Sequence, residues 1–120
     1  MGTPVQGTRG VPIILSIANG ASQSDVGYLN GGLITGFHVP ASFEGGYLTF
    51  QRSYDGVAFD TVYQQAGGIK VVSATSGTFV ELDSPAAWLG CLAFKVTSTD
   101  SAGVATNQTG ATSIVAIVSP

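Results

Sequence analysis

The stretch that decides the fold class is YLTFQRSYDGVAFDTVY, residues 47–63. Its first seven residues alternate apolar and polar side chains, so that Leu48 and Phe50 share one face and Thr49 lies on the other. A period of two residues is typical of a half-buried β-strand. We therefore predict a strand over residues 47–53.

The strand is followed by an Asp-Gly pair, Asp55 and Gly56, and the alternation then resumes. Asp and Gly tolerate the positive φ angles that tight hairpins require. We predict that residues 57–64 return antiparallel to the first strand and form a hairpin with it.

Short apolar runs separated by turn residues continue along the chain, and no stretch has a convincing 3.6-residue period. Further strands are expected at residues 11–18, 33–39, 69–74, 78–83, 91–98 and 111–119. We therefore predict an all-β fold, a single antiparallel β-sandwich or jelly roll of about seven or eight strands with an extended N-terminal arm. The arm and first strand occupy residues 1–18 and the sandwich domain residues 19–120. Residues 19–32 and 99–110 are expected to be long loops.

For some segments the sequence allows more specific predictions. We expect strands 69–74 and 78–83 to pair around a Thr-Ser-Gly turn, and residues 84–90 to form one helical turn. The nearly continuous apolar run 111–119 is expected to be buried on both faces. The side chains expected in the core include Phe50, Phe59, Phe79, Trp88, Leu92, Phe94 and Val96.

The composition limits the classes of partner. Charged residues make up 9% of the chain, against about 25% in an ordinary soluble domain, whereas 44% are hydrophobic. Much of the surface must then consist of neutral or aromatic residues. Such a surface is either solvated or covered by another protein, and the low charge favours a surface that another protein covers. With a net charge of −3 and four Lys and Arg residues, we expect no nucleic-acid partner.

No set of residues points to catalysis, and we expect a protein that is not an enzyme, with no metal and no cofactor. His38 is the single histidine, and Cys91 is the single cysteine, so no disulfide forms within the chain. Asp55 and Asp60 are too few for a calcium site. The first ten residues lack a secretion-signal pattern, which favours cytosolic synthesis. No apolar run reaches the roughly 18 residues of a membrane span, so no membrane partner is expected.

Several motifs after residue 33 occur together in one kind of protein. They are a Pro-Ala-Ser-Phe connection, LTFQRS continued by YDGVAF and VY, then ELD, a turn with Trp88, FKV and a final apolar strand. In these motifs, residues 33–119 resemble small β-sandwich structural proteins of tailed bacteriophages. The S-x-DG-x-x-F hairpin also resembles that of galactose-binding-like jelly rolls in carbohydrate-binding modules.

The resemblance implies a virion protein: a capsid decoration (cement) protein, or a head or tail fibre domain. One domain with a short arm favours the decoration protein, assembled in the host cytoplasm and bound to the major capsid protein on the capsid surface. A homotrimer is the expected oligomer. The residues expected at the capsid or oligomer interface are Val11, Ile13, Leu15, Tyr28 and Tyr54.

The alternative is a carbohydrate-binding module that recognises a glycan. Tyrosines on a β-surface either stack on sugars or become buried at a protein interface, where a ring with a polar tip is favoured. The possible sugar-binding residues are Tyr28, Tyr54, Asp55 and Trp88. The sequence leaves both functions open.

Overall fold

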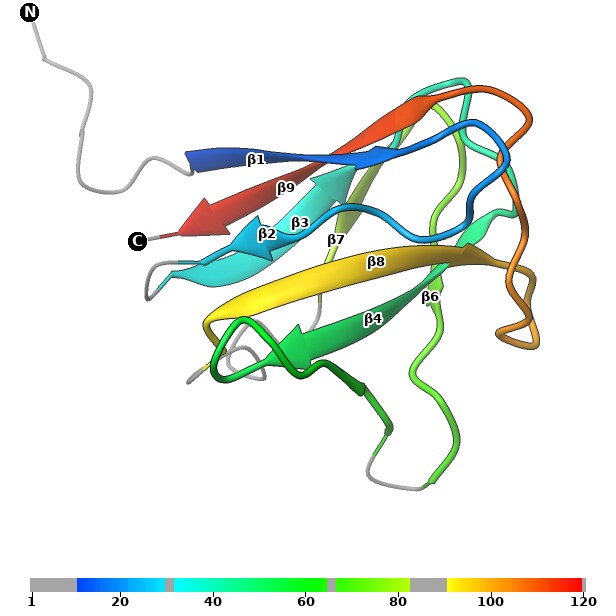
Figure 1. The fold of residues 1–120 in the computed structure, drawn as a ribbon. Coiled ribbons are helices and arrows are strands. Elements are labelled where there is room, and N and C mark those ends of the chain that lie inside the picture. Colours follow the sequence, from blue (N-terminus) through cyan, green and yellow to red (C-terminus); the bar gives the residue numbers. More distant parts are fainter. Residues whose placement is uncertain (1–10, 30–31, 65–66, 83–90, 120) are drawn as a thin grey trace, which may run out of the picture.

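The computed structural model describes residues 11–29, 32–64, 67–82 and 91–119. Over these residues the chain is all-β, with two antiparallel sheets and no helix. Figure 1 shows the sheets facing each other, and the chain passes repeatedly from one to the other. The predicted all-β fold is therefore confirmed. The described part contains nine strands, slightly more than expected, because four of them are only two or three residues long.

The first sheet, sheet A, has the strand order β1-β9-β3-β7. Its strands are β1 (Val11–Ile17), β9 (Thr112–Ser119), β3 (Leu33–His38) and β7 (Phe79–Glu81). All seven residues of β1 pair with β9, and β9 also pairs with β3. The first and last strands of the described chain are therefore neighbours, which ties its two ends together.

The second sheet, sheet B, has the strand order β2-β8-β4-β5, and β6 also pairs with β4. Its strands are β2 (Gly27–Tyr28), β8 (Ala93–Thr99), β4 (Tyr47–Ser53), β5 (Asp60–Thr61) and β6 (Val72–Ser73). The predicted hairpin of β4 and β5 is present, but the two strands pair at only two positions. The other end of the same β4 edge is taken by β6.

The core lies between the two sheets and is built from the inward side chains of both. Phe37 of β3 stacks on Phe50 of β4, with ring centroids 5.5 Å apart and ring planes at 23°. Phe94 and Val96 of β8 are fully buried beside them, as their alternation predicted. Burying one large apolar side chain contributes about 1.5–3 kcal/mol, so these residues hold the sheets together.

Two segments pair differently from the prediction. Residues 69–74 and 78–83 do not pair with each other, since β6 joins sheet B and β7 joins sheet A. The Thr-Ser-Gly turn between them carries the chain from one sheet to the other. Residues 19–32 are also not simply a loop, because they contain β2 and single bridges at Gln23 and Ser24. Local sequence patterns find strands but not the edges at which they pair.

Some burial expectations are wrong as well. β9 is fully buried on one face only, and its other face carries exposed or partly covered residues: Ser113, Val115 and Ile117. Phe79 is 55% exposed on the same side of sheet A, and Leu92, just before β8, is 38% exposed. For β9 and Phe79 the reason is that no layer of the described chain covers the outer face of sheet A. Residues 84–90, including Trp88, lie outside the described residues.

A buried glutamine ties three loops together at the end of the sandwich where β1, β3 and β8 finish. Gln108 is 1% exposed. Its side-chain amide donates to the Glu44 carbonyl (2.8 Å) and accepts from the Glu44 N–H (3.0 Å). Its backbone accepts from the Gly20 N–H (2.7 Å) and donates to the Ala21 carbonyl (2.8 Å). Loop backbone groups at this end thus have partners, as buried polar groups require.

We expect Gln108→Ala to lower the free energy of unfolding by about 2 kcal/mol, because it removes both amide bonds and leaves loop groups unpaired. Urea denaturation at neutral pH measures this change. Asn107→Ala, at the exposed neighbouring position, is the matched control and should stay within about 0.5 kcal/mol of the wild type. Equal effects of the two variants would contradict the role given to Gln108.

Candidate interaction surface

The turn after β4 is built on three residues, Ser53, Asp55 and Gly56. Asp55 Oδ1 accepts N–H bonds from Val57 (2.8 Å) and Ala58 (3.0 Å). It also accepts the Ser53 hydroxyl bond at 3.0 Å. Gly56 has a φ of 82°, which glycine adopts without steric cost, and its N–H donates to Ser53 Oγ at 2.8 Å. The Asp-Gly turn is therefore confirmed, although it is wider than a two-residue hairpin.

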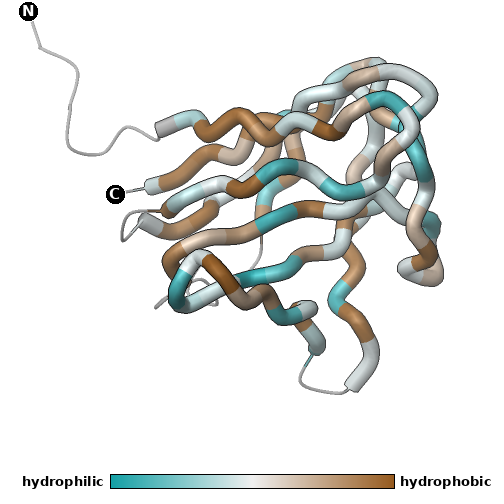
Figure 2. The backbone as a smooth tube through the Cα atoms, viewed as in Figure 1, coloured by the Kyte–Doolittle hydropathy of each residue, from teal (hydrophilic) through white to brown (hydrophobic). Residues whose placement is uncertain are grey.

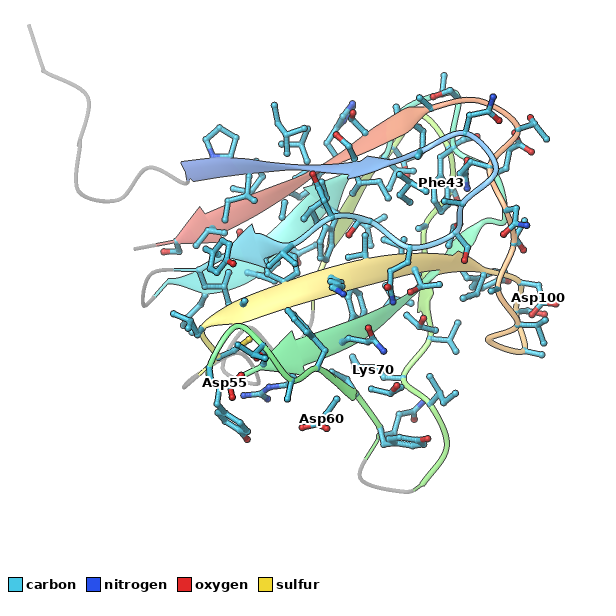
Figure 3. The ribbon with its side chains drawn as sticks, in the orientation of Figure 1. Phe43, Asp55, Asp60, Lys70 and Asp100 are labelled. Carbon is cyan, nitrogen blue, oxygen red and sulfur yellow. The ribbon has the colours of Figure 1, made fainter. Side chains whose placement is uncertain are left out.

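The same bonds lower the pKa of the Asp55 carboxyl below its ordinary value. The largest cause is the Val57 N–H, followed by the Ala58 N–H and the Ser53 hydroxyl, all of which favour the charged form. One carboxylate oxygen of Asp55 thus already accepts hydrogen bonds within the turn. Figure 3 shows Asp55 at this turn and Asp60 farther along the hairpin, where β5 begins. The part that Asp55 plays in sugar binding stays a prediction.

The turn lies against two apolar side chains from other elements. A Cβ placed on Gly56 would be 3.7 Å from both Tyr28 Cε1 and Leu92 Cδ2. Tyr28, on β2, is 52% exposed, and Val57 is 83% exposed. Tyr28 is held there because β2 pairs with the start of β8. We call this group the tyrosine end; its residues are Tyr28, Tyr54, Gly56, Val57 and Leu92.

Tyr54 is the most exposed tyrosine of the described chain, at 71%. The Arg52 guanidinium carbon lies 5.5 Å from the centre of its ring, within the range of a cation–π contact. Arg52 belongs to β4, so the contact connects the ring to a strand of sheet B. The sequence pointed to both Tyr28 and Tyr54, and the fold brings them to one end of the sandwich.

The start of β1 lies at this same end. Gly32, which follows the β2 segment, lies against the Val118 side chain, and Val118 pairs with Val11. Figure 1 shows the start of β1, the end of β9, the tip of β2 and the turn after β4 on the same side of the view. β1 therefore starts at the same end of the sandwich as the tyrosine end.

Two of the predicted interface residues of β1, Ile13 and Leu15, lie on the core-facing side of the strand. Leu15 is fully buried and Ile13 is packed against the core, so in this fold the Leu15 side chain contacts the core instead of a partner. Val11 begins the strand. The exposed apolar residue of β1 is Ile14, at 64%. The exposure of Ile14 follows from strand alternation, because neighbouring residues of a strand point to opposite faces and Leu15 points inward.

The remaining reactive side chains stay apart from one another. His38 is exposed on β3, and the Cys91 thiol is buried and donates to the Ala93 carbonyl at 2.9 Å. Within the described segments, no three His, Cys, Asp or Glu residues come together as a metal site would need. Of the predicted sugar-binding set, Trp88 lies outside the described residues. The exposed groups of the tyrosine end are therefore aromatic rings and aliphatic side chains.

No protein-family model matches the chain, and neither a curated protein nor a solved structure matches it. In the part of the chain that the structure describes, no helix has the length and apolar character needed to cross a membrane. Any functional proposal therefore rests on the residues of the described surface.

Because the folded-state pKa of Asp55 is lowered, its carboxylate stabilises the fold above the ordinary carboxyl pKa, and this stabilisation is lost as the pH falls through the folded-state value. We expect an NMR titration of the Asp55 carboxyl carbon to give a pKa below that of an unperturbed aspartate. The Val57 and Ala58 amide signals should follow the same titration, and Asp55→Asn should abolish it. A midpoint at or above the ordinary value would contradict this account of the turn.

Proposed function

We propose that this chain is a non-enzymatic virion structural protein, a decoration (cement) protein that binds the outer surface of a bacteriophage capsid and stabilises it. Its partner is the major capsid protein, and it is assembled in the host cytoplasm. The proposal takes the fold to be a jelly roll preceded by an N-terminal arm. The alternation of most successive strands between two sheets supports this fold.

The observation that carries the proposal is the meeting of the tyrosine end with the start of β1. Tyr28, Val57 and Leu92 expose apolar surface at the end of the sandwich where β1 starts. A charge-poor chain that exposes such groups is prone to associate with another protein surface. The arm and the tyrosine end can then bind the same shell, because β1, which follows the arm, starts at this end of the sandwich.

The proposed mechanism is a clamp. The tyrosine end lies on one capsid subunit, and residues 1–10 extend over a neighbouring one, ordering as they bind. A specific contact of this kind buries about 800 Å² on each partner. Tyr28 and Tyr54 suit such a contact, since each ring becomes buried while its hydroxyl keeps a polar partner.

Repetition over the shell strengthens this clamp. Many identical sites increase the effective concentration of each bound copy, so a modest contact gives a large total occupancy. A homotrimer at threefold positions of the shell is the assembly that the proposal expects. Bound across subunit boundaries, the protein would resist separation of the capsid subunits.

Carbohydrate binding is the second candidate function, favoured by the exposed Tyr28 and Tyr54 rings. Tyr54 is open to solvent over most of its surface, as sugar stacking requires, and Arg52 lies beside its ring. Against this function, Asp55 Oδ1 already accepts three bonds within its own turn. We therefore place shell binding first.

We expect the double variant Tyr28→Ser and Tyr54→Ser to bind capsids at least about tenfold more weakly than the wild type, because it removes two aromatic anchors. Co-sedimentation with purified capsids of tailed bacteriophages measures the affinity. Deletion of residues 1–10 should also weaken binding, since it removes the arm of the clamp.

The matched control is Tyr63→Ser, because Tyr63 is 62% exposed but lies beyond β5, on the edge of sheet B. Its affinity for capsids should equal that of the wild type. Unchanged binding of the double variant would refute the proposed contact surface. Absence of capsid binding, together with a glycan-array signal that the double variant loses, would establish the second candidate instead.

A further inference from the structure

The outer face of sheet A carries two rows of side chains that run across all four strands. The register places Ile14, Val115, His38 and Phe79 in one row. It places Pro12, Ile117, Gly36 and Glu81 in the next row. Neighbours of these residues along the strands belong to the core or pack against it, so both rows point outward. These neighbours are Ile13, Leu15, Phe37, Val80, Ile114, Ala116 and Val118. We call these eight residues the sheet A face.

This face is unusually apolar for a solvent-facing surface. Ile14 is 64% and Phe79 55% exposed. A Cβ on Gly36 would come within 2.5 Å of Phe79 Cζ, so the end of the ring lies over the glycine. Among the four described strands of sheet A, Glu81 is the one Asp, Glu, Lys or Arg residue. Figure 2 shows the hydrophobic stretches along β1 and β9. The face therefore lacks the charges that usually keep a sheet solvated.

The free edge of β1, in contrast, is partly closed against pairing. The Ser16 N–H donates to Asp25 Oδ1 (2.9 Å), and the Ser16 carbonyl accepts from the Asp25 N–H (3.1 Å). Alternate residues of a strand direct their backbone groups to the same edge, so Ile14 and Pro12 share this side. Pro12 has no N–H to offer. These two features hinder strand addition at this edge, and the sheet A face is an exposed surface for association besides the tyrosine end.

We propose that a second copy of this chain covers the sheet A face, in a two-fold contact of sheet against sheet. His38 and Glu81 lie on the adjacent strands β3 and β7, one row apart. Face-to-face packing can set each His38 against Glu81 of the other copy, which makes the face complementary to itself. The apolar rows of the two copies then become buried against each other. This inference does not depend on the proposed function, and it differs from the expected homotrimer.

The size of the face sets the strength of the contact. Four strands about 4.8 Å apart, with about seven residues at about 3.4 Å each, cover at most roughly 450 Å². A standard stable interface buries about 800 Å² per partner. The contact is therefore weak, with a dissociation constant in the micromolar range or above.

Sedimentation equilibrium of the full chain, from about 1 μM to about 1 mM, tests the proposal. The wild type should pass from monomer toward dimer as its concentration rises. Ile14→Lys and Phe79→Ser should each weaken dimerisation by at least about tenfold. Val104→Lys is the matched control, because Val104 is equally exposed, at 62%, on the loop between β8 and β9, and it should dimerise like the wild type. Two variants on different strands keep the test valid if one of them fails to fold.

A charge exchange separates self-association from other forms of assembly. Glu81→Lys should weaken the dimer, and adding His38→Glu to the same chain should restore it, since the pair is then reversed in both copies. A chain that stays monomeric throughout would overturn the proposal. So would an oligomer, trimers included, that Ile14→Lys and Phe79→Ser leave unchanged. Capsid binding by the tyrosine variants is measured separately, so either proposal can fail while the other stands.

Discussion

The stacking of Phe37 on Phe50 between the two sheets is the contact on which the rest of this structure depends. The rings come from β3 of sheet A and β4 of sheet B, so neither sheet can bury its ring without the other. A chain of this length has a single core to bury, and its strands must return to that core repeatedly. Most successive strands alternate between the sheets, and the connections gather at the two ends of the sandwich.

The two ends satisfy their loop backbones in different ways. At one end Gln108 reaches into the loops and bonds to Glu44, while Glu44 accepts from the Thr109 hydroxyl. These bonds lower the pKa of the Glu44 carboxyl, first through the Thr109 hydroxyl and then through its N–H. At the other end, the turn around Asp55 satisfies itself within a few residues. Tyr28, Tyr54 and their neighbours are consequently free to face solvent there.

Because the chain has few charged residues, both exposed surfaces consist mostly of aromatic and aliphatic side chains. The tyrosine end combines aromatic rings with the Arg52 guanidinium, whereas the sheet A face is aliphatic apart from Phe79, His38 and Glu81. The two surfaces come from different sheets, and each has its own set of exposed residues. In the proposed function the tyrosine end contacts the shell, and the sheet A face is the surface proposed to join copies of the chain. The physical separation of the two patches permits both contacts at once.

Much of this fold was predictable because its signals are local. Alternation along residues 47–53 identified β4 and its buried face, and Asp55 with Gly56 identified the turn, since φ preference and a two-residue period depend only on near neighbours. Tyr28 and Tyr54 were recognisable as surface candidates from their amphipathic rings. Their meeting at one end was not, because they are joined through β2, β8 and the turn, which lie far apart in the sequence.

Which strands pair, and which side chains become buried, depends on the assembled fold. Nothing in residues 69–83 tells that β6 belongs to sheet B and β7 to sheet A, because each strand pairs with whichever edge the core leaves open. Alternation implied that Ile14 and Leu15 lie on opposite faces, and packing determined that Leu15 is the buried one. Phe79 looks like a core residue in the sequence, yet it lies over Gly36 on a sheet face that no layer of the described residues covers. Burial is a property of the layers around a side chain, and those layers exist only once distant strands have come together.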